Sequence, residues 1–573
     1  MNQEITIKIA GAAGQGMQTV GFVLGKLFTR AGLQVFALQD NESRIRGGHN
    51  FFQMRAAETP VLSMVSSIDI LIALNQNAIT LHQQELSERG IIIHDNKQSA
   101  IPSAQAHACG IPLEGIAVEM GGNEIFSNFV ALGAVLAIIK ADFNILDTFL
   151  REFFSSKPDS ADANSRAARA GYDYVQGHYQ HFSLPLHLHQ HAQKTMFMNA
   201  HEAVALGACA AGCQFFAAYP MSPATSILSY LAPRSEKFSM VVEQAEDEIA
   251  AINMAIGASF SGVRAMTATS GGGFSLMVET LGFAGISETP LVVVNAQRPG
   301  PATGLPTRTE QGDLRFVLHS SQGEFPRVIL APSTPRDAFY LTIKAFHLAY
   351  TYQIPVIILT DQYLADSFFT EELFHIPEIP ANDFSLTQEE LTGEIPYLRY
   401  RFTESGVSPR IPPGWRGKET ICDSHEHSED GHITEDAVLR KKMVEKRFKK
   451  EETIIKEIVP PLIAGSEKSD ILIIGWGSNY GVLKEVTEQL IHEGIPLALM
   501  HFQEIWPFPA KAVIQRLDQA RRWIVVENNY TAQLAGILQE QTGRSPDGTV
   551  LKYDGRPFFF EELLGALRKE VEK

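Results

Sequence analysis

An acidic cluster near the middle of the chain opens a run of apolar and small residues. Residues 241–251 read Val-Val-Glu-Gln-Ala-Glu-Asp-Glu-Ile-Ala-Ala. Three isoleucines recur there and just beyond at helical spacing: Ile249, Ile252 and Ile256. Glu246 lies three residues before the first of them, so the pattern predicts an apolar helix face with Glu246 at its rim. A carboxylate in that place is costly to bury without a partner, which raises the question of what Glu246 would meet.

Two interpretations of these acids fit the sequence. In the first they belong to the opening turn of a helix, where the helix dipole favours negative charge, and this accounts for Glu243, Asp247 and Glu248. In the second, Glu246 meets a ring nitrogen of a cofactor. The helix is rich in alanine and glycine, so a neighbouring element can pack closely, and Thr269-Ser270-Gly271-Gly272-Gly273 follows it. For Glu246 the two interpretations stay open.

A second motif, Tyr219-Pro220-Met221-Ser222-Pro223, follows a strand-like segment and precedes a helix-like one. Ser222 suits the N-cap position and Pro223 the first helical position. The motif is therefore complete as a helix start. A helix N-terminus also binds anions, so the Ser222 hydroxyl could hold a substrate carboxylate or carbonyl. Taken alone, the motif supports both interpretations equally.

A long Gly- and Pro-rich loop, residues 295–311, leaves the end of an apolar strand. Ligands bind outside the carboxyl ends of parallel strands. Arg298 stands at that place, and its planar, always charged guanidinium can hold a carboxylate through two bonds. A single loop arginine is more often a surface ion-pair partner, but the position after an apolar strand favours a role in binding.

The remaining patterns are weaker. Gly11-x-x-Gly14-x-Gly16 does not have G-x-G-x-x-G spacing, so a tight turn that meets an anion such as phosphate is favoured over an NAD site. The run of His187, His189 and His191 has no nearby carboxylate or thiol ligands, and the residues around Cys422 fit no zinc pattern. No four-cysteine motif is present for an iron–sulfur cluster. The sequence therefore predicts no metal site of its own.

Composition narrows the class of protein. The chain has 573 residues, a net charge of −17 and four cysteines. The negative charge argues against nucleic acid or an anionic membrane as the main partner, and an anionic substrate would need a local basic group. The few cysteines suit a reducing cytoplasm, and no apolar run long enough for a membrane span or basic leader is apparent.

Strand, helix and glycine-turn patterns alternate along most of the chain, which predicts α/β domains with mainly parallel sheets. The predicted strands are 5–10, 33–38, 68–74, 90–94, 214–218, 264–268, 291–295, 327–330, 355–359, 471–474 and 523–526. The domains that would position the motifs are 1–190, 195–385 and 466–573. Residues 386–465 are rich in Pro, Gly, His and charge. They hold one predicted helix, from Thr434 to Lys450, whose basic end we interpret as a solvated face. Residues around 182–194 read as a linker.

Taken together, these motifs resemble the α subunits of 2-oxoacid:ferredoxin oxidoreductases with a γ domain fused at the N-terminus, most of all those that act on 2-oxoglutarate. The resemblance covers nearly the whole chain. Its motifs are residues 11–16 (GAAGQG), 42–48 (ESRIRGG), 219–223 (YPMSP), 246–273, 300–307 (GPATGLPT), 475–478 (GWGS) and 503–509 (QEIWPFP). One departure is that Ser222 stands where the family has threonine; serine keeps the hydroxyl but loses a methyl group.

The resemblance implies a γ domain at 1–190, a thiamine pyrimidine-binding domain at 195–385, a linker that contacts the β subunit at 386–465, and a transketolase C-terminal-like domain at 466–573. It implies thiamine-dependent oxidative decarboxylation of 2-oxoglutarate with coenzyme A to succinyl-CoA and CO2, with electrons passing to ferredoxin. The diphosphate motif and the cluster cysteines are missing here. Thiamine diphosphate would therefore be shared with a β subunit that carries Mg²⁺ and a [4Fe–4S] cluster, in a pair of αβ heterodimers, and this chain alone would be inactive.

By the same resemblance, Glu246 would hydrogen-bond the pyrimidine ring of the cofactor, and we prefer it over Glu248. Arg298 would hold the substrate carboxylate together with Ser222. Further residues would line the cofactor or the substrate side chain: Tyr219, Pro220 and Ser270 for the cofactor, Thr307 and Arg308 for the substrate. Arg308 is a candidate for the distal carboxylate of 2-oxoglutarate, with Arg46 and His49 as others.

Three alternatives stay open at this point. The substrate could be pyruvate or a branched-chain 2-oxoacid, for which an apolar lining would replace Arg308. The chain could be a non-catalytic assembly or regulatory subunit that only keeps the fold, in which case Glu246 would be dispensable. Finally, it could be a nucleotide-binding oxidoreductase that uses the Gly11 turn.

Overall fold

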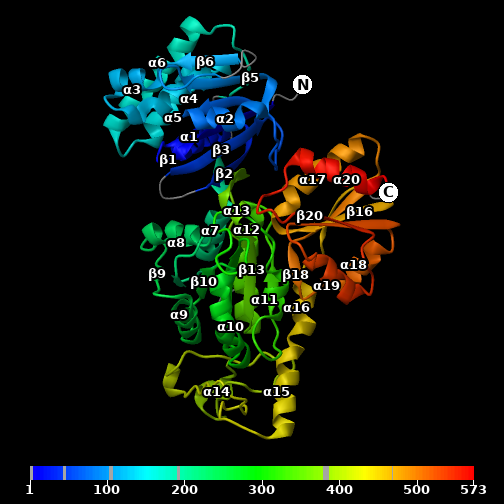
Figure 1. The fold of residues 1–573 in the computed structure, drawn as a ribbon. Coiled ribbons are helices and arrows are strands. Elements are labelled where there is room, and N and C mark those ends of the chain that lie inside the picture. Colours follow the sequence, from blue (N-terminus) through cyan, green and yellow to red (C-terminus); the bar gives the residue numbers. More distant parts are fainter. Residues whose placement is uncertain (1–3, 43–46, 102–106, 190–193, 379–385, 467–468) are drawn as a thin grey trace. The chain divides into compact units, whose positions relative to one another are not determined.

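A computed structural model describes residues 4–42, 47–101, 107–189, 194–378, 386–466 and 469–573. Two compact units divide them. The first comprises the residues up to Met198 together with Asp366–Leu373 and Phe559–Glu562, and the second comprises Asn199–Ala365, Phe374–Phe558 and Leu563–Lys573. Three sheets of eight, seven and five strands run through the chain and most of their neighbouring strands are parallel (Figure 1). The predicted α/β class is therefore confirmed.

The first unit holds the eight-stranded sheet, in the order β6-β5-β4-β1-β3-β2-β14-β7. Its strands are β1 (Glu4–Ala13), β2 (Gln34–Asn41), β3 (Gly47–Ala57), β4 (Ile68–Ala73), β5 (Leu86–Asp95), β6 (His107–Ile111), β7 (Thr195–Asn199) and β14 (Ser367–Glu372). Its helices are α1 (Met17–Arg30), α2 (Gln76–His82), α3 (Leu113–Gly121), α4 (Ser127–Ile138), α5 (Phe143–Phe153) and α6 (Pro158–His178).

The start of this sheet differs from the predicted strand–helix–strand repeat. The sequence predicts that the segments at 5–10 and 33–38 belong to one parallel series, but β3 lies between β1 and β2 and pairs antiparallel with both. Only a few residues separate the end of β2 at Asn41 from the start of β3 at Gly47, as a directly connected antiparallel pair allows. The unit also takes β14 from residues that the sequence analysis assigned to the second domain.

The expected linker around residues 182–194 is partly a packed segment. Phe182, Leu186 and Leu188 alternate with exposed residues and belong to the core of the first unit. Backbone N–H groups of Leu184 and Leu186 donate to the carbonyls of Ile138 and Ile139 at 3.0 Å each. A period of two in a short Pro- and His-rich stretch is easy to miss. Residues 190–193, with His191, lie outside the described residues.

The second unit is built on the seven-stranded sheet, in the order β18-β12-β13-β11-β10-β8-β9. Its strands are β8 (Phe215–Ala218), β9 (Val241–Gln244), β10 (Ala265–Thr269), β11 (Leu291–Gln297), β12 (Val328–Leu330), β13 (Pro355–Asp361) and β18 (Glu504–Trp506). All pairs are parallel except that of β12 with β18. The helices are α7 (Ala200–Ala210), α8 (Thr225–Leu231), α9 (Glu248–Phe260), α10 (Gly271–Ile286), α11 (Leu314–His319), α12 (Pro335–Tyr352) and α13 (Gln362–Asp366).

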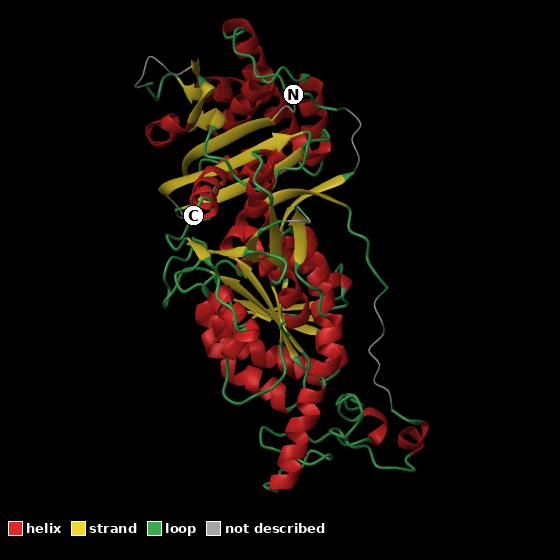
Figure 2. Cartoon of the chain, turned by 90° about the vertical axis from the view of Figure 1, so that its right-hand side faces the viewer, coloured by secondary structure: helices red, strands yellow, loops and turns green. Residues whose placement is uncertain are grey.

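The five-stranded sheet lies in the same unit, in the order β15-β17-β16-β19-β20. Its strands are β15 (Leu462–Gly465), β16 (Ile471–Trp476), β17 (Leu497–Phe502), β19 (Arg522–Glu527) and β20 (Gly548–Leu551), with helices α17 (Tyr480–His492), α18 (Ala510–Leu517), α19 (Gln533–Thr542) and α20 (Phe560–Val571). Apolar side chains of this sheet and of the seven-stranded sheet form one core cluster. Figure 2 shows helices on both sides of the strands in this unit.

Residues 386–465 hold α14 (Gln388–Thr392), α15 (Ala437–Lys449) and α16 (Glu451–Glu457), and α15 and α16 follow one another in yellow in Figure 1. The predicted helix is confirmed, and the Asp436 side chain caps it by accepting from the Leu439 N–H at 2.7 Å. Its basic end is not a solvated face, however. Lys446 and Lys450 each contact the fully buried Glu288 carboxylate at 2.5 Å, so these cations compensate a charge that the local sequence does not reveal.

Among the described residues, no single helix is long and apolar enough to cross a membrane; α3 and the segment Glu124–Ile138 reach that length and composition together but are bent by 115°. The first unit buries α4 almost entirely in its core.

The junction of the two sheets in the second unit includes a buried carboxyl group. Asp361, at the end of β13, accepts hydrogen bonds from the Ser478 hydroxyl and the Leu364 N–H, and burial raises the pKa of Asp361 to about 6.

A group whose pKa rises on folding stabilises the fold below its unfolded pKa, and that contribution is lost as the pH rises through about 6. We therefore expect Asp361→Asn to gain thermal stability relative to the wild type between pH 4 and pH 7, by about 3 kcal/mol at most. Melting temperatures measured across that range check this, and a Tm difference that does not change with pH would contradict it.

Candidate functional site

Three of the predicted site residues meet at one edge of the seven-stranded sheet. Ser222 follows β8, Ser270 follows β10, and Arg298 follows β11, and these three strands are parallel. Thr269 and Asn295 are register partners at the ends of β10 and β11. The carboxyl ends of parallel strands are where α/β sheets bind ligands, so the motifs converge for a topological reason. The first turn of α10, Gly271-Gly272-Gly273, opens onto the same edge.

The structure revises which glutamate belongs to this edge. The helix α9 begins at Glu248, and Asp247 is its extended N-cap, whose side chain accepts from the Ala250 N–H at 2.7 Å. Glu246 lies before the helix and is exposed. The predicted helix face runs from Ile249 back to Glu246, which lies outside the helix. Ile249 itself is 49% exposed. The predicted apolar face through Ile249 and Glu246 is wrong.

The face of α9 that is buried starts with Glu248 instead. Glu248, Ile252, Ala255, Ile256 and Ser259 recur at spacings of three and four and are buried. The Glu248 side chain is only 4% exposed. It lies against the first turn of α10, because a Cβ placed on Gly273 would stand 2.7 Å from Glu248 Oε1. Glycine at position 273 thus leaves the space that this carboxyl occupies.

Several buried polar atoms at this edge have no hydrogen-bond partner within the described residues. They are Oε1 of Glu248, Oγ of Ser270 and Oδ1 of Asn295. Buried polar atoms are nearly always paired in folded proteins, with protein or with ordered water, so unpaired ones that gather at a sheet edge are available to a ligand. A carboxyl oxygen, a hydroxyl and an amide oxygen fit a polar aromatic heterocycle such as an aminopyrimidine, which offers both donors and acceptors.

Arg298 is anchored by the neighbouring loop. Its Nη1 donates to the backbone carbonyl of Ser222 at 2.7 Å, and burial lowers the pKa of the guanidinium, although the charge of Asp313 opposes this. Ser222 does not cap a helix as predicted, since α8 begins at Thr225 with Ala224 as its N-cap and no side-chain cap. What the motif provides is a backbone carbonyl that holds the arginine, and Ser222 itself is half-buried.

Asp313 is a member of the site that the sequence analysis did not identify. Its Oδ2 accepts from Asn295 Nδ2 at 3.1 Å, and its backbone N–H donates to Gln297 Oε1 at 2.9 Å. A Cβ on Gly271 would stand 2.5 Å from the same oxygen. Burial raises the pKa of the Asp313 carboxyl, while the Asn295 bond and the charge of Arg298 oppose the rise. Only tertiary contacts reveal this residue, because its partners Asn295 and Gln297 lie on β11, well before it in the sequence.

The other predicted residues are more dispersed. Tyr219 is 39% exposed at the end of β8, and Pro220 is half-buried beside it. Thr307 is half-buried. The Arg308 backbone N–H donates to the Leu305 carbonyl at 3.1 Å, and its Cβ lies close to Gly555.

Two candidates lie in the first unit. His49 Nε2 is 2.7 Å from His82 Nε2, and burial lowers the pKa of the His49 imidazole. Residues 43–46, with Arg46, lie outside the described residues.

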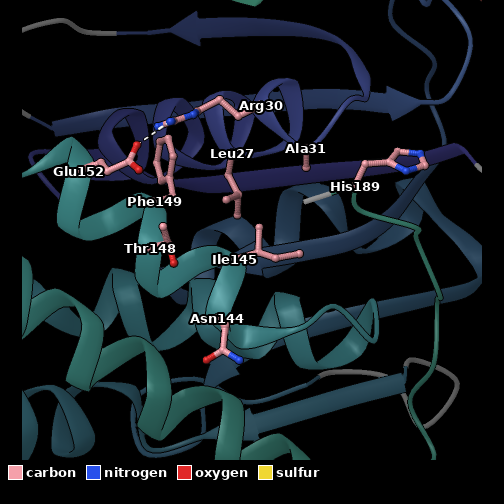
Figure 3. Close-up of a pocket in the computed structure, with 9 residues that line it drawn as sticks. All are labelled: Leu27, Arg30, Ala31, Asn144, Ile145, Thr148, Phe149, Glu152 and His189. Atoms are coloured by element: carbon pink, nitrogen blue, oxygen red, sulfur yellow. Dashed lines mark hydrogen bonds and ion pairs between the residues drawn. The ribbon is translucent and has the colours of Figure 1, made fainter. Parts of the chain in front are cut away.

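The first unit also contains an open pocket of about 500 Å³ between α1 and α5 (Figure 3). Its floor is largely apolar, with Leu27, Ile145 and Phe149, and one end is closed by the ion pair of Arg30 and Glu152 at 2.5 Å. None of the predicted site residues lines it. Across the described ranges, no three His, Cys, Asp or Glu side chains come together in a group that could hold a metal ion.

Comparisons with known proteins identify one family along most of the chain. Residues 206–446 match the family model described as pyruvate flavodoxin/ferredoxin oxidoreductase, thiamine diphosphate-binding. Residues 6–174 match that of pyruvate ferredoxin/flavodoxin oxidoreductase, and residues 469–553 match its core domain II. A 2-oxoacid:ferredoxin oxidoreductase α subunit from a Sulfolobus species is 33% identical over 98% of this chain and 96% of its own length.

Two further relatives have names that include a substrate. The 2-oxoglutarate oxidoreductase subunit KorA of Mycobacterium tuberculosis is 29% identical over 94% of this chain and 87% of its own. The solved structure of 2-oxoglutarate:ferredoxin oxidoreductase from Magnetococcus marinus, with 2-oxoglutarate, coenzyme A and succinyl-CoA bound, is 31% identical, covers 100% of both chains and has a TM-score of 0.91.

Proposed function

This chain belongs to the α subunits of the 2-oxoacid:ferredoxin oxidoreductases, and on that premise we propose that its substrate is 2-oxoglutarate. The reaction would be oxidative decarboxylation with coenzyme A to succinyl-CoA and CO2, with the electrons passing to ferredoxin. The observation that carries the proposal is the sheet edge at which the buried, unpaired Glu248 oxygen and the anchored Arg298 lie. The M. marinus and M. tuberculosis relatives support the choice of substrate.

Thiamine diphosphate fits this edge through its pyrimidine half. When bound, it would supply a nucleophilic carbon for the 2-oxo group and a thiazolium ring that accepts the electron pair left by decarboxylation. The chain would hold the ring through Glu248 Oε1, with Ser270 and Asn295 as further partners. Gly271 and Gly273 keep the approach free of side chains. Glu248 takes the role that the sequence analysis preferred for Glu246, because only Glu248 is buried at this edge.

Arg298 would bind the carboxylate next to the 2-oxo group. One N–H group of its guanidinium is held by the Ser222 carbonyl. The position of the guanidinium is therefore fixed, and its other N–H groups can donate to a carboxylate. Thr307 and Arg308, farther along the same loop, are the candidates for the distal end of the substrate, where a cation favours a dicarboxylic acid.

A β subunit would complete the site and carry Mg²⁺ and the [4Fe–4S] cluster, in a pair of αβ heterodimers in the cytoplasm. The exposed apolar residues of α9 and α10 support such a partner. Ile249 and Met254 are 49% and 41% exposed on α9, and Leu276 is 50% exposed on α10. A Cβ on Gly257 would meet nothing within 4 Å. Apolar side chains that stay exposed on two neighbouring helices indicate an interface.

Leu276→Asp is expected to weaken binding of the partner subunit by at least about tenfold, because a charge would be buried without a partner at the interface. Copurification and titration of the two subunits measure this. Val118→Asp on α3 is the matched control, since Val118 is equally exposed at 49% on a helix of the first unit. Equal binding by the wild type and Leu276→Asp would place the interface elsewhere.

The substrate proposal is tested by copurifying the chain with its partner subunit and following coenzyme A-dependent reduction of methyl viologen with a panel of 2-oxoacids. Activity confined to 2-oxoglutarate is expected. Activity with pyruvate or branched-chain acids would keep the family and reject the roles of Thr307 and Arg308. A complex that holds thiamine and clusters but acts on none of the acids would favour a regulatory subunit.

A further inference from the structure

The five-stranded sheet has a topological switch point between β16 and β19. From β16 the chain passes through α17 to β17 on one side, and from β19 it passes through α19 to β20 on the other. Both β17 and β19 pair parallel with β16. In open α/β sheets the crevice outside the carboxyl ends at such a point is where ligands bind. The turn after Trp476 and the residues after Glu527 form this crevice.

A side chain from the loop that follows β11 occupies the crevice. Gln311, at the end of the loop that starts with Arg298, is 1% exposed. Its Nε2 donates to the Trp476 carbonyl at 2.9 Å, and its Oε1 accepts from Asn479 Nδ2 at 2.9 Å and from the Asn528 N–H at 3.1 Å. Every hydrogen-bonding atom of the carboxamide thus pairs with the switch point of the five-stranded sheet.

The backbone of Gln311 is held in the same way. Its N–H donates to the Asn528 carbonyl at 2.7 Å, and its carbonyl accepts from Asn529 Nδ2 at 3.1 Å. The next residue is held as well, since the Gly312 carbonyl accepts from Gln533 Nε2 at 2.6 Å. The residues at the carboxyl ends of β16 and β19, together with Gln533 of α19, therefore hold a two-residue segment of the loop.

The crevice itself is rigid. Glu527 is fully buried and accepts from Trp476 Nε1, from Asn529 Nδ2 and from the N–H groups of Leu534 and Ala535. These bonds fix the end of β16, the end of β19 and the start of α19 on one carboxyl group. Because these bonds fix the crevice and the Gln311 carboxamide fills it, the crevice can hold the loop in one position.

The loop that Gln311 holds in place also carries Arg298 and Asp313 of the candidate site. The segment from Arg298 to Asp313 has a member of the site at each end, and Gln311 stands two residues before Asp313. Its outer part, residues 301–306, is exposed. Asp313 contacts Asn295 at the edge where the unpaired oxygens lie. Because only Gly312 separates the two residues, a change in the position of Gln311 would also move Asp313.

We propose that Gln311 is a positioning residue, and that the five-stranded domain uses its ligand crevice to hold Gln311 and so to set the loop that binds the 2-oxoacid. The inference rests on the proposed function, because that function assigns the loop to the substrate. In this account the five-stranded domain binds no small molecule at its switch point; its ligand there is a segment of the same chain.

The test uses the full chain in complex with its partner subunit. Gln311→Met keeps the side-chain volume and removes the three carboxamide bonds. We expect kcat/KM for the preferred 2-oxoacid to fall about 10- to 100-fold, mainly through KM, because small displacements of binding groups are costly. The KM for coenzyme A should not change. Hydrogen exchange of peptides from residues 298–313 should accelerate. Asn479→Ala, which removes one bond from the crevice side, should give a smaller effect of the same kind.

Ser333→Ala is the control, because Ser333 bonds His501 at 3.1 Å across the same pair of sheets without touching the loop. It should leave KM and loop exchange unchanged. The proposal is overturned if Gln311→Met and Asn479→Ala leave loop exchange unchanged, or if Ser333→Ala raises the KM as much as they do. A wild-type complex that is inactive with every acid overturns the proposed function instead, and loop exchange then still decides whether Gln311 holds the loop.

Discussion

Replacing Glu248 with glutamine is expected to reduce turnover of the complex by about 10²- to 10⁴-fold, the range that proton-transferring groups contribute in enzymes. The substitution keeps the shape of the side chain and removes the carboxyl that the buried site provides. Glu248 is 4% exposed, and its Oε1 has no hydrogen-bond partner among the residues that the structure describes. Coenzyme A-dependent reduction of methyl viologen measures the loss.

Glu246→Gln is the matched control for this prediction. The two glutamates are two residues apart, but Glu246 is exposed and lies before the helix. Its amide variant should therefore retain the activity of the wild type. A severe loss in Glu246→Gln together with full activity in Glu248→Gln would restore the original assignment of Glu246. The thiamine diphosphate content of each purified complex shows whether binding or turnover is affected.

Replacing Arg298 with lysine is expected to lower kcat/KM for every 2-oxoacid by about 10- to 100-fold, equivalent to about 1.5–3 kcal/mol. Lysine keeps the positive charge, but it lacks the planar fork that binds a carboxylate through two bonds. It would also lose the bond to the Ser222 carbonyl, which measures 2.7 Å in the wild type. Steady-state kinetics with several acids check the loss, which should appear mainly in KM.

Arg308→Gln separates the two ends of the substrate. If Arg298 binds the carboxylate common to all 2-oxoacids, its variant affects pyruvate and 2-oxoglutarate alike. If Arg308 binds the distal carboxylate, its variant weakens only the dicarboxylic acid. An Arg298→Lys complex with unchanged KM values would contradict the assignment of Arg298 to the substrate carboxylate.

The parts of the site that could be predicted from sequence are those set by topology. Ser222, Ser270 and Arg298 each follow a strand, and parallel strands bring their carboxyl ends to one edge. No knowledge of tertiary contacts is needed for that inference. The strands themselves were also predictable, because runs such as 291–295 and 355–359 are apolar and bounded by turn residues.

The errors have three physical causes. Ile249 looks like a core residue in sequence because it is apolar, but it is 49% exposed, so the helix face predicted from it passes through Glu246 instead of Glu248. Asp313, Gln311 and Lys446 depend on partners far away in sequence, so no local pattern reveals them. The antiparallel placement of β3 is a third case, since pairing partners are not encoded in the strand pattern alone.

The central claim is that this chain builds half of a thiamine site around Glu248 and that a partner subunit completes it. The most direct test is to purify the chain and the partner separately, mix them with thiamine diphosphate and Mg²⁺, and follow coenzyme A-dependent reduction of methyl viologen by a 2-oxoacid. The account predicts that neither subunit is active alone, that the mixture is active, and that a mixture made with Glu248→Gln is not. Activity of the isolated chain, or full activity of the Glu248→Gln mixture, would contradict it.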